Sequence, residues 1–176
     1  DIQITVEGNC NNTAPTIFSD DLVCVVAGSN LTTFIRASDS DIQDNVTLSA
    51  SGELFESPIN LRTNFNIQSP GNPVNTSFTW RTICEDVRLR NYSLNLRAED
   101  NAAARSSVNL VNFKSVQIKV ISPGPTNANA QATVKSITLT WDNLSCPNAS
   151  GYYIYRRNDS SGFIPSNCVT GVPDGI

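Results

Sequence analysis

The sequence predicts an all-β protein built from antiparallel β-sandwiches, and three observations carry this prediction. Apolar and polar residues alternate with a period of two over Tyr92–Ala98 and over Val116–Val120, as they do in half-buried strands. Segments rich in Gly, Pro and Asn, such as Ser69–Pro73, separate the apolar runs. No stretch has the apolar spacing of an amphipathic helix. Many short strands with such turns between them are typical of a sandwich.

Five further strands are expected ahead of Tyr92–Ala98, which gives one immunoglobulin-like sandwich of about seven strands over residues 14–122. Trp80 ends the fifth of these strands and is expected in the core. Tyr92 stands where a sandwich can place its tyrosine corner. The five strands are Leu22–Val26, Leu31–Ala37, Val46–Ala50, Leu61–Ile67 and Ser77–Arg81.

An internal repeat predicts where the domains begin and end. Ile2–Val6 matches Val116–Val120 almost position for position, and a segment rich in Gly, Pro or Asn follows each of them. If Val116–Val120 is the last strand of its domain, Ile2–Val6 is the last strand of the domain before it. We therefore expect residues 1–13 to be the end of a preceding repeat plus a linker, outside the core of the domain at 14–122.

Residues 123–176 predict a second, incomplete sandwich. Ile137–Trp141 and then Gly151–Arg156 resemble the B and C strands of a fibronectin type III domain. Such a domain needs seven strands, and this segment has room for about four. Half a sandwich leaves open strand edges and an uncovered apolar face. The alternation favours Trp141 and Tyr153 as core residues over exposed sugar-binding aromatics. The fold class is thus tandem immunoglobulin-like β-sandwiches, the second one incomplete.

Charge and hydropathy exclude two classes of partner. The net charge of −4 and the pI near 4.7 disfavour nucleic acid, because phosphate binding needs concentrated positive charge. No apolar run approaches the roughly 20 residues that cross a bilayer, so no membrane insertion is expected. The chain has neither an initiator Met nor a signal peptide, which we interpret as a mature protein or an excised fragment.

Five cysteines predict disulfides and an extracellular location, on the cell surface or secreted. There is no CxxC pair and no His, so a zinc or redox site is disfavoured. Cys146 and Cys168 flank the expected strand at Tyr152–Arg157 and are predicted to bond to each other. Cys24 is predicted to bond to Cys84, which leaves Cys10 unpaired within the chain. A Cys24–Cys84 bond would close a loop of some 60 residues, which in the chain-entropy model stabilises the fold by about 4 kcal/mol.

Two acidic segments predict a structural calcium site, and no other cofactor is expected. Asp39, Asp41 and Asp44 leave one strand end and resemble the Asp-x-Asp segment of cadherin-like domains, while Glu99 and Asp100 leave another. Five carboxylates at one pole of a sandwich could supply several of the six to eight oxygens that Ca²⁺ prefers. The alternative is that these residues are ordinary turn formers, hydrated or bonded within their own loops.

Catalysis is not expected. Without His, neither a Ser-His-Asp nor a Cys-His arrangement can form, and no Gly-rich phosphate loop occurs. Glu53 and Glu56 are the candidate carboxylate pair, but a position in a solvent-facing hairpin suits them better. The chain is therefore predicted not to be an enzyme.

The chain also resembles a repeat found in large surface proteins of gliding bacteria, those with a gliding motility-associated or type IX secretion (type B) sorting domain. Phe78–Cys84 and Ala98–Asp100 carry the resemblance in the first sandwich, and Trp141–Asp142 with Cys146–Arg157 carries it in the second. It implies export by the type IX secretion machinery and display on the cell surface.

The expected function is that of a non-catalytic structural or binding segment of an exported, adhesin-like protein. Its expected partners are neighbouring domains of the same polypeptide and surface polysaccharides or proteins. Two alternatives stay open: an accessory module of a secreted polysaccharide-degrading enzyme, and the ectodomain of a eukaryotic receptor.

Overall fold

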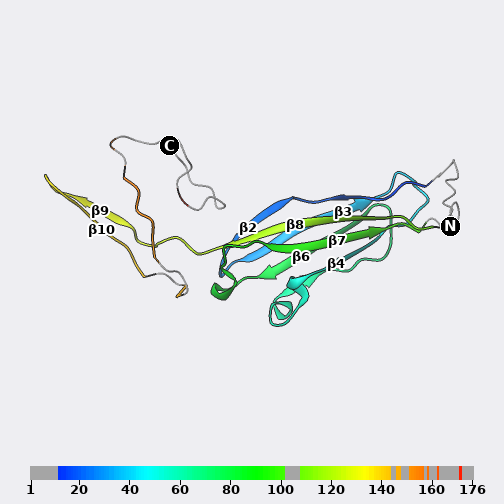
Figure 1. Cartoon of the computed structure of the whole chain (residues 1–176), viewed down its shortest axis with the longest axis horizontal. Helices are drawn as coiled ribbons and strands as arrows, with labels where there is room; N and C mark the ends of the chain where they lie inside the picture. Colours follow the sequence, from blue (N-terminus) through cyan, green and yellow to red (C-terminus); the bar gives the residue numbers. More distant parts are fainter. Residues whose placement is uncertain are drawn as a thin grey trace, which may run out of the picture. The chain divides into compact units, whose positions relative to one another are not determined.

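The computed structural model describes residues 12–101, 108–143, 146–147, 151–156, 158, 162 and 171. These residues form ten strands and three single-turn 3₁₀ helices (Figure 1). The predicted all-β class is thereby confirmed. By its internal packing the chain divides into two compact units. The first comprises Asp1–Val23, Leu31–Trp80 and Tyr92–Gln117, and the second comprises Cys24–Asn30, Arg81–Asn91 and Ile118–Ile176.

Eight of the strands form two four-stranded sheets. One sheet has the order β1-β3-β6-β5, and the other has the order β2-β8-β7-β4. The first order corresponds to strands A, B, E and D of an immunoglobulin-like sandwich. In the second sheet, β8, β7 and β4 correspond to strands G, F and C, and β2 is a further strand beside β8. The strands are β1 (Thr16–Phe18), β2 (Leu22–Val26), β3 (Asn30–Ser38), β4 (Thr47–Ser51), β5 (Thr63–Phe65), β6 (Val74–Arg81), β7 (Tyr92–Glu99) and β8 (Val111–Ile121).

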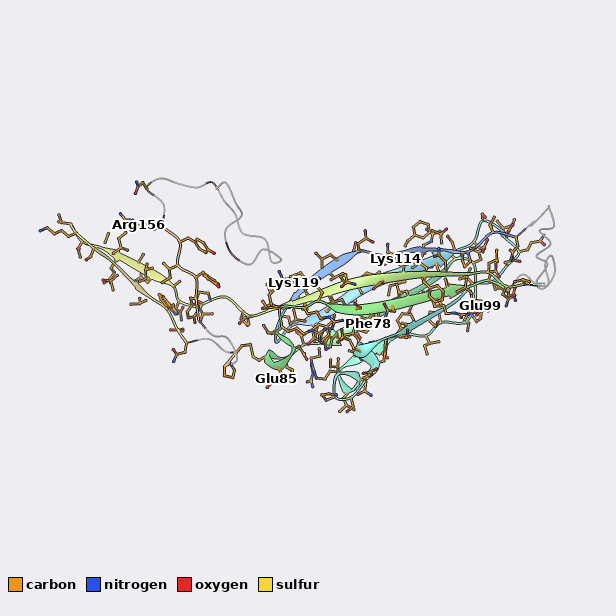
Figure 2. The ribbon with its side chains drawn as sticks, viewed as in Figure 1. Phe78, Glu85, Glu99, Lys114, Lys119 and Arg156 are labelled. Atoms are coloured by element: carbon orange, nitrogen blue, oxygen red, sulfur yellow. A yellow bond between two sulfur atoms is a disulfide. The ribbon has the colours of Figure 1, made fainter. Side chains whose placement is uncertain are left out.

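The core follows from the period-two alternation of the longer strands. Every second residue of β3 and of β7 is buried, because successive side chains of a strand point to opposite faces of its sheet. Phe78 of β6, labelled in Figure 2, is buried, and so is Trp80. The Trp80 ring meets Tyr92 edge-on, with 4.8 Å between the ring centroids. The expected core position of Trp80 is confirmed.

The connection from β4 to β5 differs from the sequence prediction. The expected strand Leu61–Ile67 shrinks to β5, because η2 (Ile59–Leu61) occupies its first residue. Glu53 opens a second 3₁₀ turn, η1 (Glu53–Phe55), and Glu56 follows it, so these two residues do not lie in the hairpin that was expected. β1 was not predicted at all, since three residues are too few to show an alternation.

In the second unit, β9 (Asn129–Ala132) and β10 (Ile137–Thr140) form an antiparallel hairpin. The expected strand at Gly151–Arg156 is wrong, since none of these residues is in a strand. Assignment of residues 123–176 to a fibronectin type III domain stays a prediction. The segment Ile2–Val6, on which the repeat argument depends, lies outside the described residues.

Candidate functional site

The predicted carboxylates Asp39 and Asp41 surround the residue that leads into the sandwich. Thr13 lies just before β1, and its backbone N–H donates to Asp41 Oδ2 at 2.9 Å. Its hydroxyl lies 2.9 Å from the same Asp41 oxygen and 3.2 Å from Asp39 Oδ1. Hydrogen bonds to a carboxylate are among the stronger ones in proteins. The two acids therefore hold the entering chain.

Asn72 fixes the turn that carries these two acids. Its amide nitrogen donates to the carbonyls of Asp39 at 3.0 Å and Asp41 at 3.2 Å. Its amide oxygen accepts from the backbone N–H of Asp39 at 3.0 Å. Asp39 Oδ1 also accepts from the backbone N–H of Asp41 at 2.8 Å, as Asp does in an Asx turn. Asp44, the third predicted acid, is buried, and its N–H donates to the Asp41 carbonyl at 2.9 Å.

Asp100 engages the residue next to Thr13. It is only 1% exposed, and its Oδ1 accepts from the backbone N–H of Leu110 at 2.8 Å. Its Oδ2 accepts from the Asn12 amide at 2.9 Å, and that amide also lies 3.3 Å from the Val108 carbonyl. Asp100 therefore closes the β7–β8 connection and anchors Asn12 at the same time. We call the set Asn12, Thr13, Asp39, Asp41, Asn72 and Asp100 the entry network.

Glu99, the remaining predicted acid, has partners of its own. Glu99 is labelled in Figure 2. It forms an ion pair with Arg97 at 2.7 Å and accepts from the Asn109 amide at 3.5 Å. The hydrogen bond from Arg97, followed by that from Asn109, lowers the pKa of Glu99. Because this pKa lies below that of the unfolded chain, the pair stabilises the fold above the unfolded pKa. That stabilisation is lost as the pH falls through the folded pKa.

We expect a carboxyl-detected NMR titration to place the pKa of Glu99 below the ordinary value for glutamate. Arg97→Gln removes the larger of its two donors and should raise this pKa towards the ordinary value. Lys114→Gln is the matched control, because Lys114 pairs with Asp21 instead and should leave Glu99 unchanged. A Glu99 pKa that does not respond to Arg97→Gln would contradict the described ion pair.

The entry network contains two buried acceptors that lack a donor. Among the described residues, Asp39 Oδ2 and Asn12 Oδ1 have no hydrogen-bond partner, although their residues are only 7% and 6% exposed. Such groups are costly unless a donor, a water or a cation satisfies them. Among the described residues, however, no three acidic or Cys side chains gather as metal ligands. The five predicted acids thus do not form one ligand set, and calcium binding stays a prediction.

Sequence reasoning missed Asn12, Thr13 and Asn72 as members of this network. In the sequence, Asn12 and Thr13 belong to the predicted linker, and Asn72 belongs to the turn-rich segment Ser69–Pro73. The Asn-Thr pair directly before Ala14-Pro15 was the available signal, since both side chains can donate to carboxylates.

Both predicted disulfides that involve described cysteines are wrong. Cys84 bonds to Cys146, with 5.1 Å between the Cα atoms. Each cysteine forms a single disulfide, so neither Cys24–Cys84 nor Cys146–Cys168 can form. Cys84 opens the 3₁₀ turn η3 (Cys84–Asp86) between β6 and β7, and Cys146 follows β10 in the chain. Cys10 and Cys168 lie outside the described residues.

A second candidate site lies in the second unit. A cavity of about 370 Å³ is bordered by the β9–β10 hairpin and residues 152–155. Trp141 meets Tyr152 edge-on there, with 5.1 Å between the ring centroids. Tyr153 is 89% exposed and Trp141 is partly exposed, so neither is buried in a core as expected.

Comparison with known proteins assigns no family to the chain. No family model and no curated protein matches it. Among solved structures it is similar to the SrpA adhesin from Streptococcus sanguinis, with 16% identity over 67% of this chain and 64% of that one, and a TM-score of 0.47. It is also similar to murine CRIg, with 9% identity over 62% of this chain and 99% of that one, and a TM-score of 0.44.

A third similar structure is the ASH/PapD-like domain of human CEP192, with 10% identity over 70% of this chain and 96% of that one, and a TM-score of 0.45. At such identities, and with TM-scores below 0.5, these likenesses assign no ligand, activity or partner to the chain. Within the part of the chain that the structure describes, no helix has the length and hydrophobicity needed to span a membrane.

Proposed function

We propose that this chain is a non-catalytic structural and binding segment of an exported, adhesin-like protein of the cell surface. The entry network is the observation that carries the proposal. Asn12 and Thr13 are tied to three carboxylates of the sandwich, so the chain enters the domain in a fixed direction. A spacer that holds binding surfaces away from a cell needs such fixed junctions, because a loose linker lets neighbouring domains fold back.

Two further features support an extracellular, non-enzymatic role. The Cys84–Cys146 disulfide is of the kind that persists in oxidising compartments. Of the predicted acids, Asp39, Asp41 and Asp100 accept hydrogen bonds from backbone N–H groups at the point where the chain enters the sandwich, as structural groups do. We extend the proposal to an array in which residues 14–122 are one domain between two others. The resemblance to repeats of gliding bacteria adds the type IX secretion machinery as the proposed export route.

Labelling of intact cells of the source organism tests this function. Antibodies raised against the chain should bind unpermeabilised cells, and mild protease treatment of those cells should remove the signal. An antibody against a cytoplasmic protein of the same cells is the control for lysis. Labelling that requires permeabilisation would contradict display at the surface.

We also propose that Ca²⁺ binds at the entry network, where Asn12 Oδ1 and Asp39 Oδ2 lack donors. Extracellular modules bind Ca²⁺ with Kd values around 0.1–1 mM, so about 10 mM Ca²⁺ should stabilise the fold by roughly 1.4–2.7 kcal/mol. The Tm should therefore rise by several degrees relative to a sample in chelator.

Asp39→Asn should abolish the calcium-dependent rise in Tm, because it removes a carboxylate charge from the network. Asp20→Asn, at an exposed acid, should keep the rise and is the matched control. An unchanged Tm for the unsubstituted chain in Ca²⁺ would remove the metal from the proposal and leave the hydrogen bonds of Thr13 as the junction.

A further inference from the structure

An open strand edge borders a groove in the first unit. β4 is the last strand of its sheet and pairs with β7 on one side only. β5 is likewise the last strand of the other sheet. A groove of about 410 Å³ lies along these two edges, and its lining residues carry no formal charge. Besides the two edge strands, Phe55, Asn60 and Ile67 line it.

The register shows which backbone groups of β4 point away from β7. Val46 exchanges two backbone hydrogen bonds with Gly71, at 3.0 and 3.2 Å, so its N–H and C=O face the outer edge. Backbone groups alternate between the two sides of a strand. Leu48 and Ala50 therefore also present their N–H and C=O to the outer edge. No strand pairs with them there among the described residues.

β4 has no Lys, no Pro and no bulge, three of the features that normally protect an edge. Natural sheets shield edge strands with Lys, Pro, bulges or very short strands. β1 and β5 are short, with three residues each, whereas β4 has five residues and reads Thr-Leu-Ser-Ala-Ser. Ile67 on the groove is 80% exposed, and Leu61 nearby in the chain is exposed as well. An unprotected edge beside exposed apolar residues is typical of a surface that pairs with another strand.

We propose that β4 pairs with β4 of a second copy of this chain, antiparallel and about a two-fold axis. The open groups are self-complementary: Leu48 of one copy lies opposite Ala50 of the other, and each such pair exchanges two hydrogen bonds. Only this register uses the outward N–H and C=O groups of both Leu48 and Ala50. The corresponding groups of Val46 already bond to Gly71. The uncharged edge brings no like charges together. The two-fold axis then passes next to Ser49, so Ser49 of one copy lies opposite Ser49 of the other.

The contact is small and the association is correspondingly weak. Three paired residues on each side bury far less than the roughly 1,200 Å² of a stable interface, so the dimer should dissociate at about 1 mM. Lateral contacts of this strength matter where many copies stand side by side on one surface, because avidity multiplies them. This pairing goes beyond the proposed function and does not depend on it.

Sedimentation equilibrium of the full chain up to about 1 mM tests the pairing in that concentration range. Ser49→Lys and Ser49→Glu each place like charges opposite each other on the axis and should weaken self-association roughly fivefold. An equimolar mixture of the two variants should associate at least as well as the unsubstituted chain. Ala50→Pro removes an outward N–H and should abolish association, whereas it removes no bond to β7.

Thr32→Lys, an exposed position on the central strand β3, is the matched control and should leave association unchanged. Circular dichroism of each variant establishes that the sandwich is intact. A chain that stays monomeric at the highest concentration overturns the proposal. So does a dimer that Ser49→Lys and Ala50→Pro leave unchanged, since it must use another surface.

Discussion

Replacing Trp80 by Ala should lower the free energy of unfolding by about 3–5 kcal/mol. Trp80 is 1% exposed, on the inner face of β6, with the Tyr92 ring against it. The substitution removes the buried indole and leaves a cavity that rigid strands on both sides cannot close. Because a domain of this size is stable by only about 5–15 kcal/mol, urea denaturation should show a large fall in the midpoint.

Two further variants separate packing from other effects. Trp80→Phe should cost clearly less than Trp80→Ala, because a ring remains. The indole N–H that it removes has no hydrogen-bond partner in the described part of the chain. Phe113→Ala on β8 is the control, since Phe113 is 70% exposed and its loss should change stability by less than about 0.5 kcal/mol. Equal effects of Trp80→Ala and Phe113→Ala would contradict the core described above.

Removing the Cys84–Cys146 disulfide should cost up to about 4 kcal/mol. The bond joins residues 62 apart in the sequence, and opening a loop of this length restores much entropy to the unfolded chain. We expect Cys84→Ser and Cys146→Ser to lower the midpoint of urea denaturation by similar amounts. The double variant should resemble either single variant, since all three lack the same bond.

Reduction of the unsubstituted chain with dithiothreitol gives an independent measurement of the same cost. The resulting fall in the free energy of unfolding should match that of the double variant, provided the other cysteines contribute little to stability. A double variant as stable as the unsubstituted chain with its disulfide intact would contradict this prediction. It would mean that linking Cys146 to Cys84 does not stabilise the sandwich.

The fold was predictable where strands are long and half-buried. β3 and β7 agree with their predictions to within one residue at each end, and every second residue of both strands is buried. The limits of β2 also agree with its prediction, which rested on a short apolar run bounded by turn residues. A strand is not predictable in this way where the apolar pattern is short or misleading. Leu61 and Ile67 suggested a strand seven residues long, yet both are exposed, and the chain before β5 forms 3₁₀ turns instead.

The candidate site was predictable only in part. Turn-forming acids at strand ends were visible in the sequence, so Asp39, Asp41 and Asp100 were found. Their partners were not, because Asn12 and Asp100 are 88 residues apart and only the folded sheets bring them together. The disulfide prediction failed for the same reason, since a cysteine pair is decided by Cα distance and not by spacing along the chain.

Peptide mapping of the non-reduced protein, isolated from its source organism, tests most directly that this chain is an oxidised, extracellular sandwich. Trypsin should release Thr82–Arg88 linked to Ser136–Arg156, the two peptides that contain Cys84 and Cys146. Thr82–Arg88 linked instead to Asp1–Arg36, which contains both Cys10 and Cys24, would contradict the Cys84–Cys146 bond of the described structure. Cys84 and Cys146 both recovered as free thiols would contradict the extracellular location itself.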